Sequence, residues 1–98
     1  MPRVFLYGCL GTYSGNCEFR WTSPPIGGKH KFILFFLQDD DSSPQDAATE
    51  VARFGFEDVQ ISTGKPIDVE SLNEPAMHVF RKHYEGAFAE GSSIVWYP

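Results

Sequence analysis

Cysteine is scarce in this chain, and long apolar runs are absent. The 98 residues include only two cysteines, Cys9 and Cys17, which are too few for the disulfide-dense scaffold of a small secreted domain. The longest apolar run covers six residues, 32–37, whereas a membrane-spanning helix requires about 18. The N-terminal segment is a poor signal peptide, because Tyr7 and Gly8 interrupt its short apolar stretch. These absences predict a cytoplasmic protein with reduced thiols.

Basic side chains are also in deficit. The chain carries 8 Lys and Arg residues against 13 Asp and Glu residues, and its formal net charge is −5. The imbalance is uneven, because residues 1–38 carry a net charge of +3 and residues 39–98 carry −8. An acidic protein is a poor general ligand for nucleic acid or anionic membranes. It is a reasonable partner for a basic protein surface.

Reactive side chains do not occur at the spacings of known catalytic or metal sites. Cys9, Cys17 and His30 are three potential zinc ligands, but their spacing fits no usual zinc site. His78 and His83 are five residues apart, so they point from different faces of a helix. No Gly-x-Ser-x-Gly motif is present. We therefore expect no cofactor and no metal, and the sequence favours a protein that is not an enzyme.

The six-residue apolar run lies within residues 31–38 and predicts a central strand. It is too short for an ordinary helix and is rich in residues that favour strands. Because side chains alternate along a strand, its even-numbered residues face one side and its odd-numbered residues face the other. Both sets are apolar, which is typical of a strand covered on both faces.

The rest of the chain predicts further strands and two helices. Residues 3–10 and 17–23 are expected to pair as a hairpin. Other strands are expected at 58–63, 67–69 and 94–97, the last of them interior because it is apolar on both faces. Helices are expected from Pro44 to Phe54 and from Asn73 to Glu90, with Gly55 and Gly91 as their stop signals.

The order of these elements predicts one α+β domain over residues 1–98. Residues 1–30 would form an N-terminal β-hairpin and loop. Residues 31–98 would form the core in the ferredoxin-like βαββαβ order, within a mixed or antiparallel sheet of about five to six strands. Right-handed crossovers would place both helices on one face of that sheet. One helix on each face is the alternative.

Two helices on one face would leave aromatic side chains on the other face without cover, and such patches mark interaction sites. The acidic run after the central strand is a second candidate contact. It could also hold Mg²⁺, but a solvated turn fits better because no second acidic motif or phosphate-binding loop accompanies it. The residues predicted to contact a partner are Tyr7, Phe35, Tyr97, Arg20, Asp39, Asp40 and Asp41.

The first functional hypothesis is a small acidic protein-binding module without enzymatic activity. Bacterial inhibitor or immunity proteins, which plug a toxin's active site, have this kind of role, and a homodimer through the same face is a close variant. The alternative is a small ligand-binding protein or enzyme of the dimeric ferredoxin-like kind, with a pocket lined by Tyr7, Cys9, Arg20 and His30. A third hypothesis is RNA binding through aromatic residues of the sheet. A concave pocket holding a His or Cys with a shifted pKa would favour the alternative, and a flat apolar patch would favour protein binding.

Overall fold

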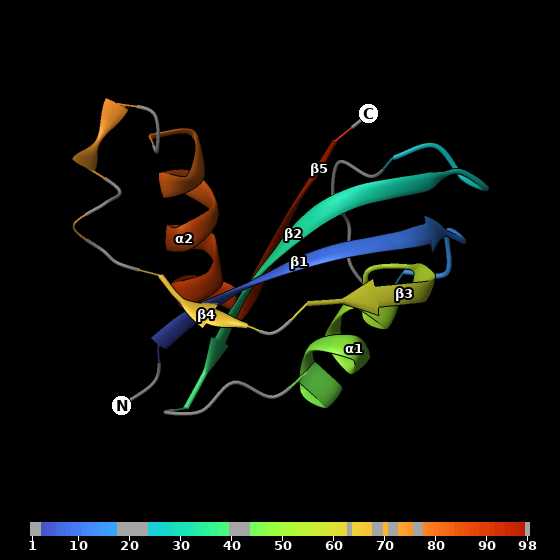
Figure 1. Ribbon diagram of the computed structural model, residues 1–98, viewed down its shortest axis with the longest axis horizontal. Helices are drawn as coiled ribbons and strands as arrows, with labels where there is room; N and C mark the ends of the chain where they lie inside the picture. The colour runs from blue at the N-terminus through green and yellow to red at the C-terminus, as the bar shows by residue number, and fades with distance from the viewer. Residues whose placement is uncertain are drawn as a thin grey trace.

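The computed structural model describes residues 3–17, 24–39, 44–62, 64–67, 70, 73–75 and 78–97. Within them the chain forms an α+β fold with a five-stranded antiparallel sheet and two helices, as the sequence predicts at this level (Figure 1). The elements are β1 (Arg3–Tyr13), β2 (Lys29–Gln38), α1 (Pro44–Arg53), β3 (Phe56–Ile61), β4 (Lys65–Pro66), α2 (His78–Glu90) and β5 (Ser92–Tyr97).

The two longest strands, β1 and β2, lie side by side in the middle of the sheet. The strand order is β3-β1-β2-β5, and β4 also pairs with β1. β1 and β2 pair from Arg3 opposite Gln38 to Thr12 opposite Lys29. β3 and β4 share the other edge of β1, and β5 takes the other edge of β2. The N-terminal strand therefore lies inside the sheet, and the ferredoxin-like order is not confirmed.

Two predictions about strand pairing are wrong. β1 is paired along both edges, so it has no continuous edge left for the predicted hairpin partner at 17–23. Residues 18–23 of that partner lie outside the described part of the chain. β5, which was expected inside the sheet, lies at one end of the observed strand order. Its apolar side chains are covered from above and below, since Ile94 packs on the α1 side and Val95 on the α2 side.

The two helices cover opposite faces of the sheet (Figure 1). Ala47 of α1 belongs to one core with Tyr7 and Phe32. Ala87 of α2 belongs to a second core with Val4 and Phe35. The alternation predicted for the central strand is thus confirmed, and the expected placement of both helices on one face is wrong. The handedness rule applies to the connection through α1, because β2 and β3 both run antiparallel to β1 and are therefore parallel to each other. It does not fix the side of α2, because β4 and β5, which α2 connects, run in opposite directions.

Each helix covers only part of its face. α1 packs mainly against β3, at one side of the sheet, and α2 packs mainly against β5 and β2, at the other side. On the α2 face, most of the half of the sheet formed by β1 and β3 therefore has no described helix above it.

Glycines fix the ends of both helices, as the sequence predicts. Gly55 and Gly91 have φ angles of 102° and 95°, which place them in the left-handed region that ends helices. β3 also contains a bulge, because one extra residue of β3 lies opposite the stretch of β1 between Leu10 and Thr12. Asp58, at the bulge, has a φ of 52°.

Burial of Phe35 predicts a large loss of stability when its ring is removed. Phe35 is 0% exposed in the core under α2. Phe35→Ala should lower the free energy of unfolding by about 3–5 kcal/mol, because it removes buried area and leaves a cavity. Urea unfolding followed by circular dichroism measures the loss. Phe88→Ala, at a ring that is 48% exposed, is the matched control and should cost far less; equal losses would contradict this packing.

His83 predicts a pH-dependent stability. Its ring stacks on Phe35 with centroids 5.6 Å apart, and its Nδ1 lies 3.1 Å from Oγ of Ser93. Burial, and secondarily the charge of Lys82, lowers the pKa of His83 below its ordinary value of 6.5. The unfolded chain therefore binds a proton on this side chain at a higher pH than the folded chain does. The contribution of neutral His83 to the free energy of unfolding is complete above about pH 6.5 and is lost as the pH falls toward the folded-state pKa.

Unfolding of the parent chain and of His83→Gln, measured from about pH 7.5 to about pH 5.5, isolates this contribution. Glutamine can retain a hydrogen bond to Ser93 but does not titrate. The free energy of unfolding should fall less steeply with acidification in the variant. Identical slopes in the two proteins would mean that His83 titrates equally in the folded and unfolded states.

Candidate binding site

The residues predicted to form a partner-binding face do not share a surface. Tyr7 and Phe35 are both 0% exposed, and they lie in the cores on opposite faces of the sheet. The Tyr7 hydroxyl donates a hydrogen bond to Oε1 of buried Gln38, and the Phe35 ring contacts that of Phe80. The uncovered aromatic face expected from the sequence is therefore corrected: each face has its own helix, and these rings are core.

The other predicted contact residues are scattered or lie outside the described part. Asp39 is exposed directly after β2, and Tyr97 is the last residue of β5, opposite Lys31. Arg20, Asp40 and Asp41 lie outside the described residues. The structure therefore brings none of the predicted contact residues that it describes together in one exposed patch.

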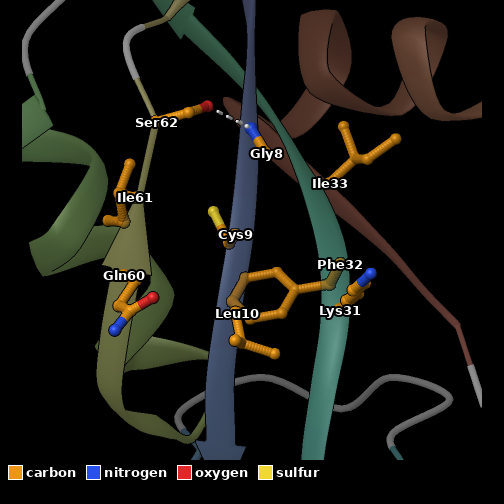
Figure 2. A pocket seen from close by; sticks show the side chains of 9 residues that line it. All are labelled: Gly8, Cys9, Leu10, Lys31, Phe32, Ile33, Gln60, Ile61 and Ser62. Carbon is orange, nitrogen blue, oxygen red and sulfur yellow. Dashed lines mark hydrogen bonds between the residues drawn. The ribbon is translucent and has the colours of Figure 1, made fainter.

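A shallow hollow lies where three neighbouring strands meet (Figure 2). It has a volume of about 560 Å³ and is largely open to solvent. Three consecutive residues from each of three adjacent segments line it, namely residues 8–10 of β1, 31–33 of β2, and 60–62 at the end of β3.

The pairing of the strands arranges the surface of this hollow in two rows. In the first row, Leu10 lies between Lys31 on β2 and Gln60 on β3. In the second row, Gly8 lies between Ile33 on β2 and Ser62, which follows β3. Alternation along the strands puts both rows on the α2 face. The hollow thus occupies the half of that face that α2 leaves uncovered.

The floor of the hollow is apolar and its rim is polar. Leu10 and Ile33 are half-buried and form the floor, whereas Lys31, Gln60 and Ser62 are exposed. The remaining lining residues point to the opposite face, where they pack in the α1 core or against it; these are Cys9, Phe32 and Ile61. Lys31 is the one charged residue among the nine that line the hollow.

Gly8 gives the hollow its depth. It lies beyond the end of β3, next to Ser62. The Gly8 N–H donates to Oγ of Ser62 at 3.0 Å, and the Ser62 N–H donates to the Gly8 carbonyl at 2.9 Å, so Ser62 extends the pairing of β3 with β1. A Cβ at Gly8 would lie 3.3 Å from that Oγ, tighter than usual contact. A glycine inside a strand often marks the close approach of a ligand or another chain. That sequence signal could have pointed to the hollow, which sequence reasoning missed.

The hollow has no reactive group. Burial raises the pKa of the Cys9 thiol to about 12, and a weaker opposing effect comes from the backbone at Leu34. A thiol that stays protonated at neutral pH is a poor nucleophile. His30, expected to line a pocket with Cys9 and Tyr7, instead lies against Trp96, with ring centroids 5.6 Å apart. Across the described ranges, no three His, Cys, Asp or Glu side chains are grouped so that they could hold a metal ion.

Comparison with known proteins gives no relative: no family model, no curated protein and no solved structure matches the chain. Neither of the two described helices has the length and apolar character needed to cross a membrane. The geometry of the hollow is therefore the basis for a functional hypothesis.

The different environments of the two thiols predict different reactivities. Both cysteines are unpaired, with Cys9 buried and Cys17 exposed. Iodoacetamide at neutral pH should alkylate Cys17 quickly and leave Cys9 unmodified until urea unfolds the chain. Peptide mass spectrometry locates the label, and Cys17→Ser should abolish the fast reaction. Rapid alkylation of Cys9 in the folded protein would contradict its protected position.

Proposed function

We propose that the protein is a protein-binding module without enzymatic activity, and that the open hollow is its contact surface. The observation that carries this proposal is an apolar floor, Leu10 and Ile33, on the part of the sheet that α2 leaves uncovered. An apolar centre surrounded by polar residues is typical of a protein–protein interface. The small size of the chain fits a role of the inhibitor or immunity type, in which a small protein covers part of another.

The shape of the hollow favours a macromolecular partner over a small ligand. Its volume of about 560 Å³ is within the range of ligand pockets, but such pockets bury most of the ligand's surface. This hollow is open, and Cys9, its one thiol, is unreactive. A small-molecule site remains the second candidate on the basis of volume alone. RNA binding loses support because Tyr7 and Phe35 are buried and cannot stack on bases.

A charge placed on the floor of the hollow tests the proposal. Leu10→Glu should reduce binding to a partner at least tenfold, because it buries a carboxylate in the contact. Affinity capture from the native cells with the parent chain as bait, followed by mass spectrometry, identifies partners, and titration with a purified partner gives the dissociation constant. Phe88→Glu introduces the same charge at another exposed apolar residue and should leave binding unchanged.

Because Leu10 is half-buried, its variant is first checked by circular dichroism. Gln60→Arg, at the exposed rim, tests the same surface without disturbing either core. If Leu10→Glu folds and both variants capture the same partners as the parent with equal affinity, the hollow is not the binding surface.

A further inference from the structure

We infer that the occupant of the hollow is an extended acidic segment of another protein, with an apolar side chain over Ile33 and Leu10 and a carboxylate at Lys31. This inference rests on the proposed function and specifies the partner. It depends on three features of the hollow: its charge, the spacing of its side chains, and the missing side chain at Gly8.

The charge of the hollow is opposite to that of the protein. Lys31 is the one charged lining residue, in a chain whose net charge is −5. In the next row of the same face, exposed Lys29 and exposed Glu57 lie on either side of Thr12, so their opposite charges offset one another and Lys31 determines the charge of the hollow. A basic partner would be repelled here and attracted elsewhere on the molecule. An acidic segment is attracted specifically to this site, since complementary charge determines specificity and the rate of association.

The spacing of the side chains matches an extended peptide. Ile33 and Lys31 are two residues apart on one strand and face the same side, so they are about 7 Å apart along it. An extended segment lying along β2 has the same repeat on its own side chains. An apolar residue and an Asp or Glu separated by one residue, in the order set by the direction of the segment, therefore align with Ile33 and Lys31 respectively.

The absence of a side chain at Gly8 provides room for the apolar side chain. Gly8 lies next to Ile33 across the two strands and is exposed at its own position. The side chain of the bound segment can pack over Leu10 and Ile33 beside Gly8, and Oγ of Ser62 limits how closely it approaches the Gly8 backbone. Contact at this depth removes apolar area of both partners from water, which is the main source of binding energy.

A second copy of this chain fits the hollow less well. In a symmetric dimer through this surface the same patch is used twice, so two copies of Lys31 would be enclosed in one small contact. Like charges brought together across an interface oppose association. The charge therefore selects against self-association through the hollow and in favour of a different, acidic chain.

Selection from a phage-displayed library of random nine-residue peptides tests the inference. The parent chain should enrich peptides in which an apolar residue and an Asp or Glu are separated by one residue, in either order. Lys31→Glu should instead enrich Lys or Arg at the acidic position, and Phe88→Glu should give the same peptides as the parent. In fluorescence anisotropy, the best synthetic peptide should bind Lys31→Glu at least tenfold more weakly, and its affinity for the parent should fall as salt is added.

The outcomes separate this inference from the proposed function. Peptides that require Leu10 but show neither acidic enrichment nor dependence on Lys31 would overturn the inference and leave the proposed function standing. Peptides that bind Leu10→Glu as well as the parent would overturn both. The inference would also be overturned if the parent chain enriched no peptides. It would be overturned as well if light scattering detected a dimer that Leu10→Glu dissociates, because a second copy of the chain would then occupy the hollow.

Discussion

The antiparallel pairing of β1 with β2 is the constraint on which the rest of the structure depends. Both strands are long, and both carry apolar side chains on their two faces. Such a pair is not stable in water until each face is covered, because the exposed apolar area would be too large. The chain covers one face with α1 and the other with α2. The sheet is therefore the middle layer of a three-layer molecule built from a short chain.

The limited length of the helices explains the location of the candidate site. α1 begins at Pro44 and ends at Arg53, and α2 begins at His78 and ends at Glu90. Each is too short to shield a whole face. α1 lies over the β3 side of one face, and α2 lies over the β5 side of the other face. The area left beside α2 is shallow and apolar at Leu10, and Lys31 and Gln60 border it. The site thus follows from incomplete cover of the sheet, rather than from a dedicated loop or motif.

The sequence predicts local structure well and the arrangement of elements poorly. The two-faced pattern of residues 32–37 correctly indicates a covered strand, and Gly55 and Gly91 correctly mark the ends of the helices. These features depend on the periodicity and backbone preferences of neighbouring residues, which the sequence contains directly.

The pairing partners of β1 and the side taken by each helix could not be predicted, because they depend on contacts between distant segments. An apolar pattern on two faces indicates cover above and below a strand, and it does not identify the strands beside it. For this reason β5 was expected inside the sheet and is at one end of it. The hollow could not be predicted for the same reason, since Leu10, Lys31 and Gln60 come together only through strand pairing.

The bulge in β3 has a consequence for how another chain can approach. A regular outer strand exposes a row of backbone donors and acceptors, which invites edge-to-edge addition of foreign strands and growth into fibrils. The left-handed backbone at Asp58 interrupts that row, and the adjacent carboxylate of Glu57 adds negative charge to the margin. The flank of the sheet next to the hollow is thereby protected against strand addition. A segment bound as proposed would lie on top of the sheet, where side chains discriminate between sequences, and not along its flank, where backbone pairing would accept almost any sequence.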